Sequence, residues 1–128
     1  MQLFIKQFEE LSLDELYDIL AARAEVFVVE QDCVYQDMDD KDQPSYHLFL
    51  KDNDDVVAVS RIIPEGISYD EMSIGRVVVK KTHRGQGISK IMMKLHSKHG
   101  LILISCMMVL SYSLKIQLLM LFLAHRIH

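Results

Sequence analysis

A glycine-containing turn that leads into a helix is the part of this sequence best suited to chemistry. Residues 74–90 form a valine-rich run, then a basic turn, then the first residues of an apolar helical pattern. Such a turn presents successive backbone N–H groups at the positive end of a helix, where they can bind phosphate. Gly85 and Gly87 would let the backbone approach the ligand closely. Three basic side chains supply charge: Lys81, Arg84 and Lys90.

The spacing of the turn excludes two common phosphate motifs. A Walker loop requires Gly, four residues and then Gly-Lys-Ser/Thr, which is absent. A dinucleotide loop requires a third glycine where Lys90 stands. What remains is Arg-x-x-Gly-x-Ser, made by Arg84, Gly87 and Ser89. It resembles the pyrophosphate loop of the GNAT superfamily of N-acetyltransferases, Gln/Arg-x-x-Gly-x-Gly/Ala, and Ser89 is the one departure.

A second segment resembles the ElaA-like branch of the same superfamily. It consists of residues 26–35, followed by Asp37, Asp39, Asp42 and His47. Together the two segments cover residues 1–100 in the expected order. The resemblance implies a single GNAT-like domain over residues 1–128, with 1–100 typical of the family and 101–128 an atypical apolar tail.

The resemblance implies an N-acetyltransferase that moves an acetyl group from acetyl-CoA, its co-substrate, to a primary amine. No metal is implied, and the acceptor would be a small molecule or a peptide. Backbone groups of Val77 and Val79 would pair with the pantetheine arm. The N–H groups of Gly85, Gln86, Gly87 and Ser89 would hold the pyrophosphate, with Arg84 and Lys90 contributing charge.

The resemblance leaves the catalytic acid and base unassigned. Relatives often use a carboxylate or a bound water as base and a tyrosine beyond the fifth strand as acid. Glu30 and Glu71 are weak candidates for the base, each with a structural role as the alternative. Tyr112, the only tyrosine after the loop, is a weak candidate for the acid. Cys33 is interpreted as a buried small residue rather than a nucleophile, because no paired histidine is evident.

The elements that must position this loop can be predicted from periodicity. Ser12 and Glu15 form a capping box, and a helix is expected over 13–27, followed by a short helix from residue 28. Strands are expected over 2–8, 47–51, 56–63 and 74–79, then a helix from 88 that ends at Gly100, then a strand over 101–106. The residues expected on the buried face of the first helix are Leu13, Leu16, Tyr17, Leu20, Ala24 and Phe27. This order predicts an α/β fold, a GNAT-type mixed sheet flanked by helices.

An acidic cluster between the first helices and the second strand raises the question of calcium. It comprises Asp37, Asp39, Asp40 and Asp42. An EF-hand loop would need glycine where Asp42 stands and glutamate where Leu48 stands. We therefore expect a solvated acidic loop.

Residues 101–128 differ in character from the rest. They contain no Asp, Glu, Gly or Pro, although a complete GNAT domain continues with turns that need such residues. We expect a truncated or frame-shifted tail, with the fold ending after the fifth strand. A membrane-spanning helix over 101–124 is less favoured, because Lys115 and Gln117 interrupt it. Alternatives to an active enzyme are a catalytically impaired CoA-binding remnant, which could form a homodimer through its C-terminal part, and an interaction or membrane-attached protein that acts through the tail.

The charges are distributed asymmetrically along the chain. All 18 acidic residues precede Met72, giving residues 1–71 a net charge of −13, whereas residues 72–128 carry +9. This pattern indicates either an anion site in the second half or an ordinary surface that folding mixes. The chain is acidic overall, so nucleic acid is not an expected partner. Two cysteines imply no disulfide framework, and we expect a cytoplasmic protein.

Overall fold

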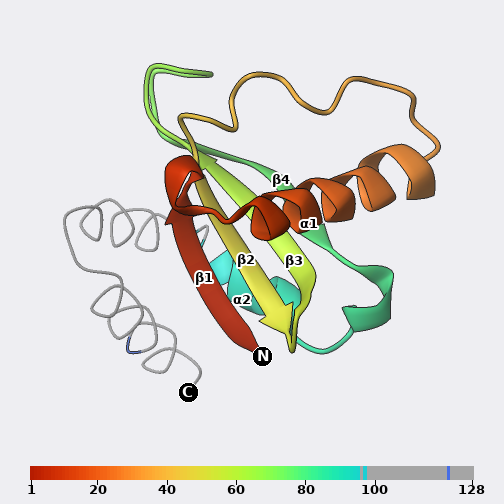
Figure 1. The fold of residues 1–128 in the computed structure, drawn as a ribbon. Coiled ribbons are helices and arrows are strands. Elements are labelled where there is room, and N and C mark those ends of the chain that lie inside the picture. Colours follow the sequence, from red (N-terminus) through yellow and green to blue (C-terminus); the bar gives the residue numbers. More distant parts are fainter. Residues whose placement is uncertain (96, 98–120, 122–128) are drawn as a thin grey trace. The chain divides into compact units, whose positions relative to one another are not determined.

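An antiparallel four-stranded sheet forms the centre of the first part of the chain (Figure 1). The computed structural model describes residues 1–95, 97 and 121, and it divides into two units, Met1–Gln86 and Gly87–His128. The strands follow the sequence order β1-β2-β3-β4. Their bounds are Gln2–Gln7 for β1, Tyr46–Asp52 for β2, Asp55–Ile63 for β3 and Ser73–Val79 for β4. The four strands expected before the cofactor loop are thus confirmed.

The expected hairpin between the second and third strands is present. Asp52 pairs with Asp55, so Asn53 and Asp54 form the turn. Asn53 adopts a φ of 56°, a left-handed conformation that asparagine tolerates better than most residues. The hairpin aligns β2 and β3, and every residue of β3 after Asp55 is buried.

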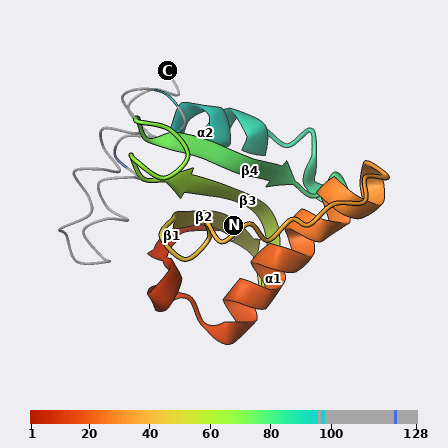
Figure 2. The same ribbon diagram turned by 90° about the horizontal axis from the view of Figure 1, so that it is seen from above.

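Helix α1, Leu13–Ala24, lies across one face of this sheet (Figure 2). Its start has the expected capping box, because the Ser12 side chain accepts from the Glu15 amide and the Glu15 side chain accepts from the Ser12 amide. The chain then continues as a π-helix, η2, over Glu25–Glu30. The separate short helix expected from residue 28 is wrong: the first helix changes its hydrogen-bond spacing and extends to Glu30.

The buried face of α1 also differs from the expected one. Leu13 and Tyr17 are exposed, whereas Ile19 and Ala22 are buried together with two charged residues, Glu15 and Arg23. The hydrophobic periodicity failed to predict these two charged residues on the buried face, because buried charges are rare unless they are paired. Here Glu15 accepts from Lys6 Nζ at 2.9 Å.

A row of apolar side chains crosses the sheet beneath α1. Phe4, Phe49, Val59 and Val78 are successive partners across the four strands. The rings of Phe4 and Phe49 stack with centroids 5.1 Å apart. Phe49, Val59 and Val78 belong to one core cluster with Ile19, Ala22 and Val26, and Phe4 packs against it.

Strand β4 contains an irregularity close to its centre. Val59 pairs with Val78 and Arg61 pairs with Gly75, so β4 has one more residue than β3 in this interval. Arg76 lies in the bulge with a φ of 55°. A bulge of this kind bends the strand and redirects the side chains beside it.

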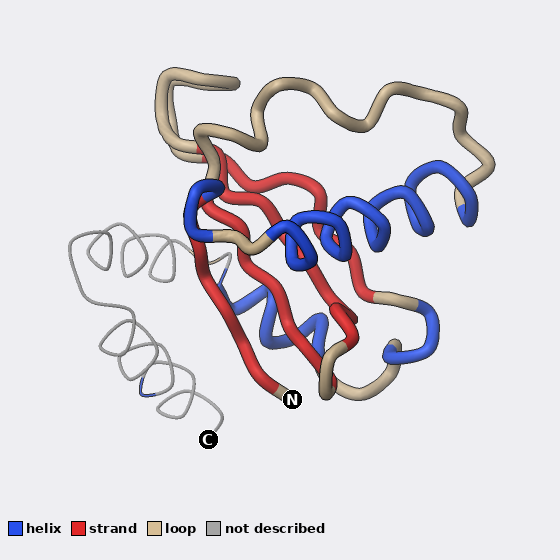
Figure 3. The backbone as a smooth tube through the Cα atoms, in the orientation of Figure 1, coloured by secondary structure: helices blue, strands red, loops and turns tan. Residues whose placement is uncertain are grey.

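Residues 31–45 join η2 to β2 and contain no helix or strand (Figure 3). Two short 3-10 helices complete the first unit, η1 at Phe8–Glu10 and η3 at Lys81–His83.

In the second unit the described element is helix α2, Ile88–Leu95. It buries Ile88, Met92 and Leu95, while Met93 is exposed, in agreement with the helical pattern predicted from residue 88. The predicted cap at Gly100, the strand over 101–106 with its parallel pairing, and the ending of the apolar tail lie outside the described residues. Within the described part, no helix is both long and apolar enough to cross a bilayer.

Candidate functional site

Strand β4 presents an edge that a strand-like ligand could use. Within the described residues β4 pairs with β3 alone, so its other edge has no strand partner. Val77 on this strand is 42% exposed, and Val79 is its last residue. An unpaired edge of this kind offers N–H and C=O groups to an extended ligand.

The glycine turn after β4 has a backbone conformation that favours glycine. Gly85 and Gly87 each adopt a φ of 81°. A Cβ built at either position would meet no atom within 4 Å. Glycine is favoured at both positions because other residues rarely adopt this φ, and the close approach of a ligand to the backbone stays a prediction.

Three successive residues of this turn have amides without a hydrogen-bond partner in the described part of the chain. The amides of His83 and Arg84 donate to the carbonyls of Lys80 and Lys81. For Gly85, Gln86 and Gly87, by contrast, no backbone partner occurs in the described part of the chain, and all three residues are exposed. These amides have the chemical character required to bind an anion.

Arg84 is held by the chain itself. Its Nη1 and Nη2 donate to the two carboxylate oxygens of Glu30 at 2.6 and 2.9 Å. Its Nε donates to the carbonyl of Val79 at 2.9 Å. The hydrogen bond from Arg84 lowers the pKa of Glu30, and the same bond raises the pKa of Arg84.

The remaining predicted site residues are distributed as follows. Ser89 and Lys90 are exposed in the first turn of α2, and Lys81 is exposed in η3. Glu71 is exposed between β3 and β4, and Tyr112 lies outside the described residues. Cys33 is a free, exposed cysteine, so its interpretation as a buried residue is wrong.

Folding pairs part of the positive half of the sequence with acids of the first half. Lys80 Nζ contacts Asp55 at 3.0 Å, Arg84 contacts Glu30, and Arg76 contacts Asp37 at 2.7 Å. The net charges of the two halves therefore overstate the positive field near the turn.

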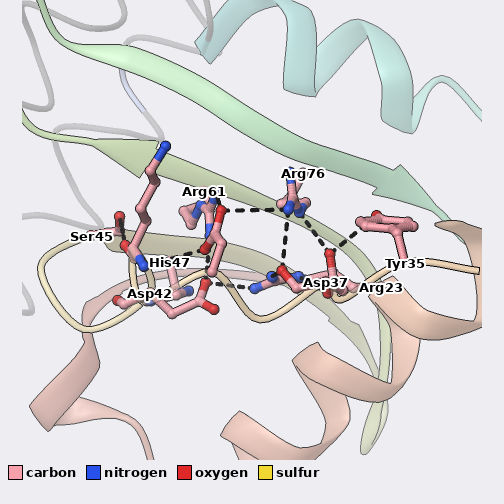
Figure 4. A network of polar contacts seen from close by, with 10 residues as sticks. Arg23, Tyr35, Asp37, Asp42, Ser45, His47, Arg61 and Arg76 are labelled. Carbon is pink, nitrogen blue, oxygen red and sulfur yellow. Dashed lines mark hydrogen bonds and ion pairs between the residues drawn. The ribbon is translucent and has the colours of Figure 1, made fainter. Parts of the chain in front are cut away.

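Part of the acidic loop is a buried network of ion pairs (Figure 4), whereas Asp40 is exposed, as expected for a solvated loop. Asp37 and Asp42 are buried. Arg23 Nε donates to Asp37 at 2.9 Å and its Nη1 donates to Asp42 at 2.6 Å. Arg23 itself is 1% exposed, so each of these charges depends on its partners.

Two further arginines complete this network. Arg61 Nη1 donates to Asp39 at 2.7 Å and to Asp42 at 3.0 Å. Arg76, from the β4 bulge, donates to the side chain and the carbonyl of Asp37 at 2.7 and 3.1 Å. Its guanidinium also lies 5.9 Å from the centre of the Tyr35 ring. Helix α1 and strands β3 and β4 therefore each contribute one arginine to the loop.

The network lowers the pKa values of Asp39 and Asp42. The hydrogen bond from Arg61 holds the pKa of Asp39 far below its usual range. Burial alone would raise the pKa of Asp42, but hydrogen bonds and charge from Arg23 and Arg61 outweigh burial and lower it. In the described residues, no group of three or more His, Cys, Asp and Glu side chains is arranged to hold a metal ion.

His47 is buried beside the network. Its Nε2 lies 2.8 Å from the carbonyl oxygen of Asp42, which requires the nitrogen to donate. Burial lowers the pKa of His47, so the neutral ring is favoured. The sequence contains a signal for this network. Three arginines lie in predicted helices and strands, and residues 37–42 contain four aspartates but only one lysine to neutralise them.

Comparison with known proteins identifies similar sequences. A family model described as the acetyltransferase (GNAT) family matches residues 7–101. A UPF0039 protein of Synechocystis sp. is 42% identical over 86 residues, covering 66% of this chain and 56% of that protein. Protein ElaA of Escherichia coli is 40% identical over 86 residues, with the same two coverages of 66% and 56%. The chain therefore spans 56% of the length of these two relatives.

Solved structures are similar as well. The crystal structure of E. coli ElaA gives a TM-score of 0.71 at 32% identity, covering 85% of this chain and 71% of that one. The crystal structure of an acyl-CoA N-acyltransferase from Pseudomonas aeruginosa gives a TM-score of 0.70 at 35% identity, covering 74% and 66%.

Proposed function

This chain belongs to the acetyltransferase (GNAT) family, and we propose that it transfers an acetyl group from acetyl-CoA to a primary amine. One observation carries the proposal. In the family's pyrophosphate motif, two glycines have a φ of 81°, and the amides of three exposed residues have no backbone partner among the described residues. These are the features that a backbone phosphate site needs.

The cofactor would lie along the chain from β4 into the glycine turn. Backbone groups of Val77 and Val79 would pair with the pantetheine arm, since the edge of β4 has no strand partner within the described residues. The amides of Gly85, Gln86, Gly87 and Ser89 would bind the pyrophosphate. Lys90 would add a charge without an aspartate or glutamate competing for it in the described part.

The reaction needs two proton transfers. The neutral amine nitrogen would attack the thioester carbonyl carbon, the carbon–sulfur bond would break, the new amide would lose a proton, and the departing thiolate would gain one. Glu30 is poorly suited to be the base, because Arg84 lowers its pKa and an effective base has a pKa close to the working pH. Glu71 remains a candidate for this role, and Tyr112 remains the candidate acid.

A turnover assay tests the proposed function. The full chain is incubated with acetyl-CoA and a panel of small-molecule and peptide amines, and both thiol release and the acetylated amine are measured. We expect amine-dependent turnover that exceeds hydrolysis without amine. Binding of coenzyme A without turnover on any amine would favour the CoA-binding remnant instead. A chain that binds no coenzyme A would contradict both.

A further inference from the structure

One arginine joins three segments of the first unit at the start of the glycine turn. Arg84 donates from Nη1 and Nη2 to Glu30 at 2.6 and 2.9 Å and from Nε to Val79 at 2.9 Å. Glu30 is the last residue of η2, and Val79 is the last residue of β4. The bond to Glu30 spans 54 positions of the sequence, so it fixes the turn to a part of the fold remote in the chain.

We infer that Arg84 and Glu30 form a clasp that positions the glycine turn for the cofactor, so that Arg84 is a positioning residue rather than a direct phosphate ligand. The inference rests on the proposed function, because it concerns the same turn. Three N–H groups of the guanidinium bind within the chain, out of the five it possesses. The positive charge of Arg84 is neutralised by the Glu30 carboxylate, which accepts two of these hydrogen bonds.

The exposure and the hydrogen-bond geometry of the clasp determine whether it affects overall stability or cofactor affinity. The side chains of Arg84 and Glu30 are 41% and 36% exposed, and an ion pair this exposed contributes little to overall stability. Its two parallel hydrogen bonds nevertheless fix the direction of the arginine side chain. The clasp is therefore expected to affect cofactor affinity more than the unfolding transition.

The substitution Glu30→Gln separates the clasp from direct phosphate binding, because the two predict opposite signs. If Arg84 bound the phosphate directly, Glu30 would compete with the cofactor, and its neutralisation would tighten binding. If the pair is a clasp, Glu30→Gln loses one of two matched hydrogen bonds and weakens coenzyme A binding about 3- to 10-fold, the scale of one hydrogen bond.

Substitution of Arg84 supplies a second, independent readout. Arg84→Lys keeps the positive charge but cannot form the two-pronged contact. The clasp predicts that Arg84→Lys binds coenzyme A as weakly as Arg84→Ala. It also predicts that Glu30→Gln combined with Arg84→Ala is no weaker than Arg84→Ala alone, since both remove one interaction.

Glu25→Gln is the matched control. Glu25 is exposed and acts on Arg84 through its charge, but it is no hydrogen-bond partner of Arg84 in the described part of the chain. The change removes the same charge as Glu30→Gln and is expected to leave coenzyme A affinity unchanged or slightly higher. Thermal unfolding of each variant verifies that the fold is retained.

Calorimetric titration of the full chain with coenzyme A provides the measurement. Tighter binding by Glu30→Gln, or wild-type affinity in Arg84→Lys, would overturn the clasp and leave the proposed function intact. A wild-type chain that fails to bind coenzyme A would overturn both. Weaker binding in Glu30→Gln and in Arg84→Lys, with Glu25→Gln unaffected, supports the clasp.

Discussion

Gly87 is constrained by a single backbone angle. Its φ is 81°, and a Cβ built at this position would meet no atom within 4 Å. Alanine would therefore not collide with a neighbour. We expect Gly87→Ala to cost about 1–2 kcal/mol through the left-handed conformation alone and to weaken coenzyme A binding as the turn relaxes. Thermal unfolding and calorimetry measure the two effects.

Gly75→Ala is the control for this substitution. Gly75 does not have a positive φ, and its nearest neighbour would be Arg61 Nη2 at 4.0 Å, an ordinary contact. Wild-type stability and affinity in Gly87→Ala would show that the turn does not require glycine at this position.

Arg23 shows how a buried charge differs from an exposed one. Arg23→Met would leave Asp37 and Asp42 buried without one of their partners. We expect a loss of about 3–5 kcal/mol in the free energy of unfolding, as for other broken buried pairs. Urea denaturation at neutral pH measures this loss.

The comparison for Arg23 is Lys80→Met. Lys80 pairs with Asp55, whose side chain is 61% exposed, so a loss of only about 0–1 kcal/mol is expected. Equal losses of unfolding free energy in the two variants would mean that burial does not determine how much the Arg23 contacts stabilise the fold.

The irregular segment 31–45 links stability to pH. Burial lowers the pKa of His47, so its contribution to stability is complete above about pH 6.5 and is lost as the pH falls through the folded pKa. Arg61 lowers the pKa of Asp39, and the contribution of Asp39 disappears only below about pH 4. We expect the free energy of unfolding, measured in urea from pH 8 to pH 2.5, to decline in these two stages.

Two substitutions assign the stages of this decline. His47→Gln keeps a donor for the Asp42 carbonyl and should remove the first stage, whereas Asp39→Asn should reduce the second. A stability that stays constant between pH 7 and pH 4 in the wild-type chain would contradict the role given to His47.

The strands were easier to predict than the charged contacts between elements. β-branched runs and polar turns placed all four described strands to within one or two residues, because these signals are local. The buried face of α1 was mispredicted, since Glu15 and Arg23 are buried with ion-pair partners outside the helix, 9 and 14 positions away. The same limit hid the Arg84–Glu30 pair, although the glycine turn itself could be predicted.

At the scale of the whole molecule, charge is expected to influence cofactor binding only moderately. Arg76, Lys80 and Arg84 are paired with acids, whereas Lys81 and Lys90 are exposed and have no acidic partner among the described ion pairs. We expect coenzyme A affinity to fall as ionic strength rises, because salt screens exposed charges. Calorimetry at low and high salt measures the change.

The substitution Lys90→Gln should reduce this salt dependence. Lys6→Gln, on the opposite edge strand β1, should leave it as it is. An affinity that is flat across salt concentrations would mean that the exposed charges form only a solvated surface. The homodimer expected through the C-terminal part remains a separate prediction, and light scattering tests it.

The ion-pair network also has a consequence for the order in which the chain folds. Its contacts join residues 14 to 39 positions apart, and they can be completed only after α1, β3 and β4 have met. If these contacts form after the rate-limiting step, breaking them will accelerate unfolding much more than it slows refolding. The segment 31–45 would then form its native contacts last during folding and lose them first during unfolding. The lifetime of the folded state would depend on Arg23, Arg61 and Arg76.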